Sequence, residues 1–117
     1  MEGDRADEFL DRVYYLRFDP TAPLAHKKPA ERIGRLREDL RLPDRILYYL
    51  ATPPSMYPVI AQGLLESGLN VPERDGGWRR IIVEKPFGSD LETARRLNGL
   101  LRGIFAEREI YRIDHYL

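Results

Sequence analysis

The chain has 117 residues, enough for one domain with a buried core. Its 19 basic and 19 acidic side chains balance, so charge gives no reason to expect a nucleic-acid or membrane partner. It has no cysteine, which excludes disulfides and cysteine-bound metals, and no apolar run approaches the roughly 18 residues of a membrane span. With an acidic start unlike a secretory signal, these features favour a cytoplasmic α/β or α+β domain.

The first half of the chain predicts two strands separated by a helix. Residues 13–18, VYYLRF, are rich in β-branched and aromatic side chains and predict a strand. Residues 30–40, AERIGRLREDL, place apolar side chains at helical spacing, and Pro29 suits the first turn. Residues 46–51, ILYYLA, are continuously apolar, which is typical of a strand buried on both faces of a parallel sheet.

The second half continues the alternation. A helix is predicted over residues 55–68, after Pro53-Pro54 and ending at Gly68. After a loop at residues 70–78, the stretch RIIVE at 80–84 again predicts a strand buried on both faces. Residues 89–107 predict the clearest helix, since they begin with capping-box spacing, and IYRI at 110–113 predicts a last strand. This order predicts an α/β fold: a partial doubly wound, Rossmann-like parallel sheet with flanking helices.

Polar segments follow three of these strands: ATPPSMY, EKPFGSD and IDHYL. Ligands of open parallel sheets bind beyond the carboxyl ends of the strands, so these segments are expected to converge. The side chains that would meet in one cleft are Tyr57, Lys85, Asp114, His115 and Tyr116.

Each of these residues also has a simpler interpretation. Lys85 is well placed to meet an anion, but it could equally pair with Glu84 or Asp90. Asp114 and His115 would point to opposite faces of an extended segment, so they are not expected to pair with each other. The spacing of the two histidines predicts no metal site, and no GxGxxG turn is present to hold a pyrophosphate.

The blocks YYLATPPSMY, WRRIIVEKPFGSDLETARRLN and IYRIDHYL resemble the glucose-6-phosphate dehydrogenase family, in order and in separation. The resemblance implies an NADP-dependent oxidoreductase of the pentose phosphate pathway. Its reaction oxidises glucose 6-phosphate to 6-phosphogluconolactone. It also implies a cytoplasmic enzyme of carbohydrate metabolism that forms a homo-oligomer when complete.

The resemblance assigns roles at matching positions. Tyr57 and Lys85 match residues that contact the cofactor, and Lys85 also contacts the sugar. Asp114 matches the aspartate that orients the catalytic histidine. The substrate phosphate is bound by the residues that match His115, Tyr116 and Leu117.

Other parts of the family pattern are not found in residues 1–117. The resemblance places the Gly-rich turn before this sequence, and the catalytic histidine and a large α+β domain after it. Residues 1–117 are therefore expected to be part of an NAD(P)-binding domain and to be inactive alone. The alternative is a non-catalytic module, derived from that enzyme, that binds a sugar phosphate or assembles with a partner.

Overall fold

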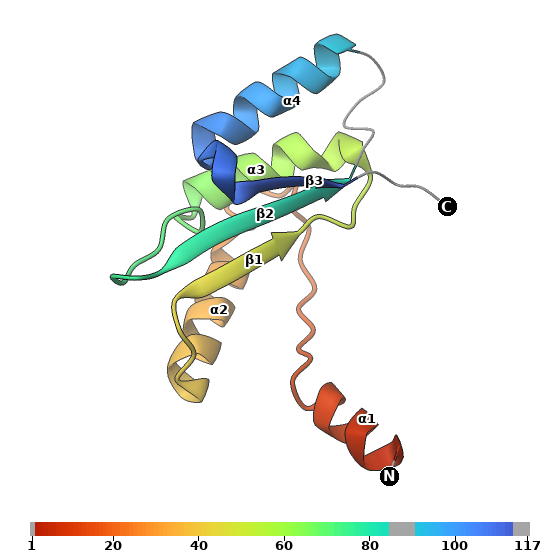
Figure 1. The fold of residues 1–117 in the computed structure, drawn as a ribbon, viewed down its shortest axis with the longest axis vertical. Coiled ribbons are helices and arrows are strands. Elements are labelled where there is room, and N and C mark those ends of the chain that lie inside the picture. The colour runs from red at the N-terminus through yellow and green to blue at the C-terminus, as the bar shows by residue number, and fades with distance from the viewer. Residues whose placement is uncertain (1, 85–90, 114–117) are drawn as a thin grey trace.

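The computed structural model describes residues 2–84 and 91–113, in which three parallel strands alternate with helices (Figure 1). The strands are β1 (Arg45–Tyr49), β2 (Trp78–Glu84) and β3 (Ile110–Ile113). The helices are α1 (Glu2–Leu10), α2 (Lys27–Leu40), α3 (Tyr57–Glu66) and α4 (Leu91–Ile104). Short 3-10 turns precede α3 and β3, at η1 (Pro54–Met56) and η2 (Glu107–Glu109). Within the described ranges, no helix is long and apolar enough to cross a bilayer.

The strands form a sheet in the order β1-β2-β3, with every neighbouring pair parallel. The register places Tyr48 beside Ile81, and Ile81 beside Ile110. Helix α3 connects β1 to β2 and helix α4 connects β2 to β3, which is the connection that parallel neighbours require. The predicted parallel sheet with flanking helices is confirmed.

The core lies on one face of this sheet. Along β2, the buried side chains alternate with half-buried ones, and those of Ile81 and Val83 are completely buried. They pack with apolar side chains of α3 and α4, including Leu64, Leu97 and Leu101. Burying each of these aliphatic side chains contributes about 1.5–3 kcal/mol. The helical layer therefore holds the sheet from one side.

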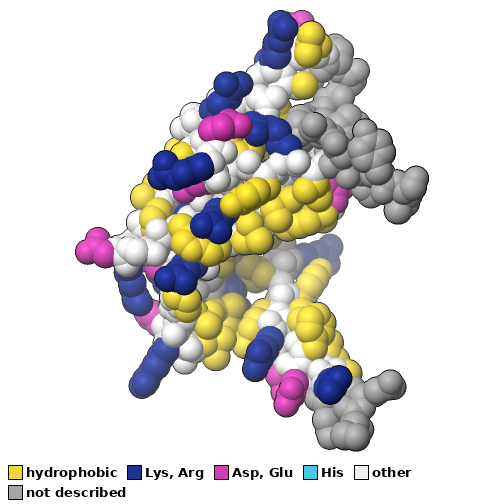
Figure 2. Space-filling model, in the orientation of Figure 1, with side chains coloured by type: hydrophobic (Ala, Val, Ile, Leu, Met, Phe, Trp, Pro, Cys, Tyr) yellow, Lys and Arg dark blue, Asp and Glu magenta, His cyan; other side chains and the backbone are white. Residues whose placement is uncertain are grey.

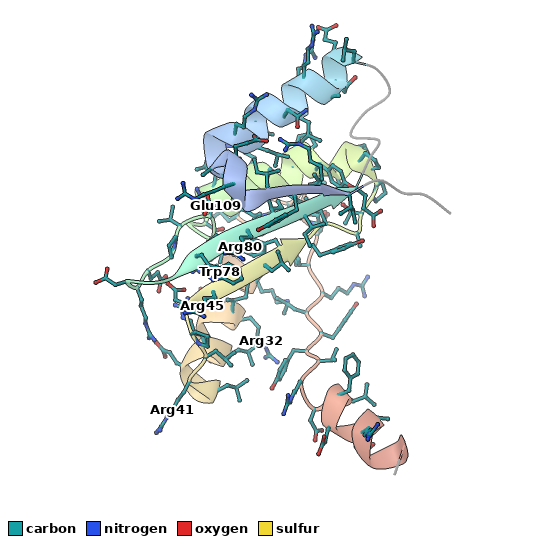
Figure 3. All side chains as sticks on the ribbon, in the orientation of Figure 1. Arg32, Arg41, Arg45, Trp78, Arg80 and Glu109 are labelled. Carbon is teal, nitrogen blue, oxygen red and sulfur yellow. The ribbon has the colours of Figure 1, made fainter. Side chains whose placement is uncertain are left out.

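The opposite face of the sheet is largely uncovered by the described residues, and apolar side chains gather on it (Figure 2). Leu47 and Tyr49 of β1 are each 51% exposed, and Tyr111 of β3 is 42% exposed. Trp78 lies on this face under the guanidinium of Arg80, whose carbon is 4.1 Å from the ring centroid (Figure 3). The prediction that these strands are buried on both faces is wrong for the described residues.

The first predicted strand is also wrong. Residues 13–18 form no strand in the structure, and α1, which the sequence pattern did not predict, lies apart from the sheet (Figure 1). The side chains of this extended segment contact the region of α2 instead. The ring of Tyr14 lies 6.0 Å from the guanidinium carbon of Arg32, and the ring of Phe18 meets His26 edge-on at 5.5 Å. These contacts cover the rings only in part, since Tyr14 is 45% and Phe18 37% exposed.

One buried carboxylate joins the elements at the amino ends of the strands. Asp44 Oδ1 accepts hydrogen bonds from Arg37 of α2 at 2.8 Å and from Arg79 of β2 at 2.6 Å. Its Oδ2 accepts from the backbone N–H groups of Glu73, at 2.5 Å, and Arg74, at 2.8 Å. Burial alone would raise the pKa of Asp44, but these hydrogen bonds and the charge of Arg79 outweigh it and lower the pKa to about 2.

We expect acid to destabilise the fold through Asp44. Its pKa of about 2 lies below the ordinary value of 3.8, so its stabilisation is complete above about pH 4 and is lost as the pH falls through about 2. The difference corresponds to about 2 kcal/mol. Urea unfolding between about pH 2 and pH 6 measures it. Asp44→Asn should flatten this pH dependence, whereas the exposed Asp39→Asn should not; an unchanged slope in Asp44→Asn contradicts the assignment.

The uncovered face of the sheet predicts self-association of the 117-residue chain. We expect sedimentation velocity to show oligomers that dissociate when Leu47 or Tyr111 is replaced by lysine, because a charge on this face opposes its burial. Val71→Lys is the matched control, since Val71 is 56% exposed and lies in the loop before β2. If the unsubstituted chain is monomeric, or if Val71→Lys dissociates the oligomers equally well, the chain does not associate through this face.

Candidate functional site

The candidate site lies at the carboxyl edge of the sheet, where all three strands end on the same side (Figure 1). The last residues of the strands are Tyr49, Glu84 and Ile113, and Glu84 is paired in register with Ile113. The segment at residues 51–55 leaves β1 at this edge with every residue exposed, and then enters α3. This segment therefore offers an exposed surface at the edge of the sheet, although its prolines and the turn before α3 leave few free backbone N–H groups there.

Tyr57 is the predicted site residue that the structure describes in most detail. It begins α3, is only 1% exposed, and directs its hydroxyl to the backbone of Glu84. The hydroxyl donates to the Glu84 carbonyl at 3.4 Å and accepts from the Glu84 N–H at 3.3 Å. The ring is therefore part of the core, and its hydroxyl joins α3 to the last residue of β2.

A second tyrosine joins the same strand end. The hydroxyl of Tyr49, at the end of β1, donates to the carboxylate of Glu84. This hydrogen bond raises the pKa of Tyr49, because the ionised phenolate could not donate it. Neither Tyr49 nor Glu84 was among the predicted site residues. The signal that could have found them is their position as the last residues of adjacent parallel strands.

The other predicted site residues, Lys85, Asp114, His115, Tyr116 and Leu117, lie outside the described residues. In the chain, Lys85 directly follows Glu84 and Asp114 directly follows Ile113. Their roles, and the alternative ion pairs of Lys85, therefore stay predictions. Among the described residues, no group of three or more His, Asp or Glu side chains is arranged to hold a metal ion.

The parallel sheet and the helical crossovers define a Rossmann-like α/β domain. A family model, "Glucose-6-phosphate dehydrogenase, NAD binding domain", matches residues 1–117. The chain belongs to this family.

Curated relatives are similar in sequence to almost the whole of this chain. Glucose-6-phosphate 1-dehydrogenase of Treponema pallidum is 44% identical over 113 residues, which are 97% of this chain and 22% of the relative. The enzyme of the same name from Aggregatibacter actinomycetemcomitans is 43% identical over 116 residues, or 99% of this chain and 23% of the relative. The chain thus spans less than a quarter of the length of these relatives.

Solved structures give the same family. A glucose-6-phosphate dehydrogenase in complex with its substrate glucose-6-phosphate superposes with a TM-score of 0.78 and 33% identity, over 97% of this chain and 23% of the other. Glucose-6-phosphate 1-dehydrogenase from Mycobacterium avium gives a TM-score of 0.75 and 35% identity, over 97% of this chain and 22% of the other.

We expect Tyr57→Phe to loosen the end of β2 without emptying the core. The ring is retained, so only the hydroxyl contacts with Glu84 are lost, which should cost about 0.5–1.5 kcal/mol of unfolding free energy. Urea unfolding and hydrogen exchange of the Glu84 amide measure the two effects. Tyr111→Phe, on the exposed side of β3, is the matched control. Unchanged exchange at Glu84 in Tyr57→Phe would show that the hydroxyl does not fix this strand end.

Proposed function

We propose that this chain provides part of the cofactor and substrate site of an oxidoreductase that oxidises glucose 6-phosphate to 6-phosphogluconolactone. The observation that carries the proposal is the family match over residues 1–117. The fold supports it, because all three strands end at the same edge of the sheet. At that edge Tyr49 and Tyr57 form hydrogen bonds with Glu84, the last residue of β2. The relatives are named for this activity.

A nicotinamide dinucleotide fits the carboxyl edge. The exposed segment at residues 51–55 offers a surface for it, between the end of β1 and the start of α3. We assign NADP as the cofactor, with contacts from the start of α3 at Tyr57 and from Lys85. When bound, this cofactor supplies the acceptor for a hydride. The Tyr57 side chain is only 1% exposed and its hydroxyl bonds to the Glu84 backbone, so little of it is open to the cofactor, and Tyr57 also fixes the strand end that precedes Lys85.

The sugar phosphate is assigned to the residues that follow β2 and β3. His115, with Tyr116 and Leu117, would bind the phosphate group of glucose 6-phosphate. Lys85 would contact both the sugar and the cofactor, and so orient one relative to the other. Asp114 would stabilise the protonated form of a histidine base that is supplied from outside these assigned residues. On this proposal the chain alone binds ligands but does not turn them over.

The proposed setting is the cytoplasm, and the proposed working form is a homo-oligomer. A relative from Arabidopsis thaliana, 51% identical over 73 residues, is named "Glucose-6-phosphate 1-dehydrogenase 6, cytoplasmic". The balanced charge of the chain supports neither a nucleic-acid nor a membrane partner.

The test is Lys85→Ala in the 117-residue chain, with NADP titrated by calorimetry. We expect about a tenfold loss of NADP affinity, or about 1.4 kcal/mol, with the melting temperature nearly unchanged, since an exposed ion pair contributes only about 0–1 kcal/mol. Lys85→Arg should restore little, because a planar guanidinium does not replace a compact ammonium group. Lys28→Ala, an exposed lysine of α2, is the control. An early-melting Lys85→Ala chain with normal NADP affinity would indicate a structural ion pair instead.

A further inference from the structure

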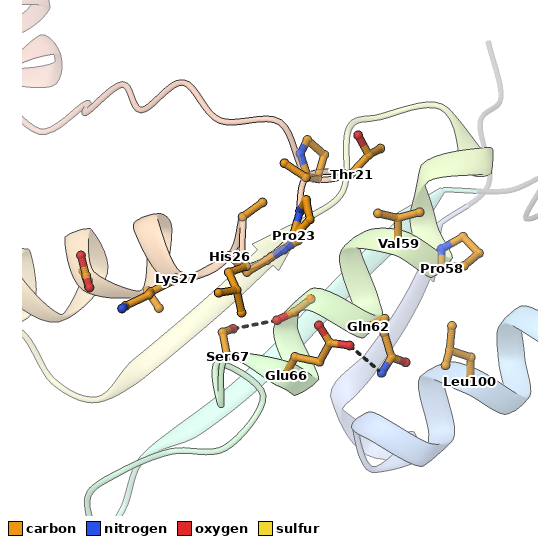
Figure 4. A pocket seen from close by; sticks show the side chains of 17 residues that line it. Thr21, Pro23, His26, Lys27, Pro58, Val59, Gln62, Glu66, Ser67 and Leu100 are labelled. Carbon is orange, nitrogen blue, oxygen red and sulfur yellow. Dashed lines mark hydrogen bonds between the residues drawn. The ribbon is translucent and has the colours of Figure 1, made fainter.

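A cavity of about 970 Å³ lies on the helical side of the molecule, between residues 20–31 and helix α3 (Figure 4). Its walls are the turn before α2, the first turn of α2, the exposed side of α3, and Leu100 of α4. Pockets that bind small molecules occupy about 300–1,000 Å³ and are lined mainly by apolar groups. This cavity has that size and composition. Its apolar lining residues are Pro20, Ala22, Pro23, Leu24, Ala25, Ala30, Pro58, Val59 and Leu100.

His26 forms the inner wall of the cavity. It is only 7% exposed, and its ring packs so closely over Gly63 that a Cβ atom there would collide with it. The ring also lines a second cavity, of about 290 Å³, that extends toward β1. Its Nε2 is buried and has no hydrogen-bond partner among the described residues, an exception to the usual pairing of buried polar atoms.

Burial lowers the pKa of His26, and the nearby carboxylate of Glu66 only partly offsets this. Burial therefore disfavours a positive charge on the inner wall of the cavity.

The charges that face the cavity favour a cation. Glu31 and Glu66 are the carboxylates of the lining, and Lys27 is its ammonium group. Figure 4 shows Lys27 on the α2 side, away from Gln62 and Glu66. Glu66 is the last residue of α3, and the carbonyl groups of the three residues before it already accept hydrogen bonds from residues 67–69, so the negative charge at this end of the cavity is the carboxylate itself. Gln62 donates to Glu66 at 3.4 Å, which places both polar groups on the same wall.

We propose that this cavity binds a small organic amine with an apolar ring. The ring would lie against the prolines and Val59, and the ammonium group would pair with Glu66 at the end of α3. A ligand with the same ring but a carboxylate in place of the ammonium group would be repelled by Glu66, so it would bind more weakly. Pro58 and Val59 of the lining lie in the first turn of α3, next to the proposed dinucleotide site, but Glu66 lies at the other end of that helix, so an amine paired with it goes beyond the proposed dehydrogenase function.

The test compares two probes with the same ring and opposite charge, 2-(1-naphthyl)ethylamine and 1-naphthaleneacetate, by ¹H–¹⁵N NMR of the 117-residue chain near pH 7.5. We expect saturable shifts with the amine, centred on residues 22–27 and 59–67, and at least about tenfold weaker binding of the acid. Shifts confined to the uncovered sheet face, or equal affinity for the two probes, would overturn the proposal.

Two variants and one competitor complete the test. Val59→Trp should fill the cavity and abolish binding of the amine, while its melting temperature reports whether the chain still folds. Glu66→Gln should reduce the preference for the amine over the acid about fivefold or more, whereas Glu38→Gln, an exposed carboxylate of α2, should leave it unchanged. NADP should not displace the amine. Displacement by NADP, or a preference that survives Glu66→Gln, would overturn the proposal.

Discussion

The fold depends on a single buried carboxylate at the amino ends of the strands. The carboxylate of Asp44 accepts four hydrogen bonds, two from arginine side chains and two from backbone amides, and so ties α2, β1, β2 and the loop before β2 to one point. Removing one partner of such a buried pair costs about 3–5 kcal/mol, because the remaining charges are left unpaired. This arrangement fixes the register of β1 and β2 at the amino ends of the strands. The candidate site lies at the opposite, carboxyl ends.

At the carboxyl ends of the strands, two tyrosine hydroxyl groups connect the described elements. Tyr57 and Tyr49 hold Glu84 through hydroxyl groups, one to the backbone and one to the carboxylate. Hydroxyl contacts contribute about 1 kcal/mol each, so they position a strand end without the cost of burying charge. The molecule thus separates two tasks along each strand, with stability at the amino ends and the candidate site at the carboxyl ends.

Much of this could be predicted from the sequence, and the exceptions have physical causes. The apolar runs correctly predicted β1, β2 and β3, and helical spacing predicted α2, α3 and α4, because short-range patterns determine these elements. The strand predicted over residues 13–18 failed, because composition reports how well side chains suit a sheet and not whether a partner strand exists.

The details of the site depend on contacts between distant segments, which a pattern does not reveal. The burial of His26 could not be predicted, because the two lysines that follow it favour an exposed position, whereas its ring packs over Gly63, which lies in another helix. The hydrogen bonds of Tyr57 to Glu84 likewise join residues 27 positions apart. The sequence could predict that the candidate site lies at the carboxyl edge of the sheet. It could not predict which side chains hold that edge in place.

The order of the strands in the sheet has a consequence for how the chain reaches its folded state. Because β1, β2 and β3 are neighbours in the same order in which they occur in the sequence, each new strand adds to an edge already formed. No strand has to be inserted between two others. Each step closes one loop of moderate length, and the entropy lost grows only slowly with the length of that loop. During synthesis, these three strands can therefore pair progressively, in the order β1, β2, β3.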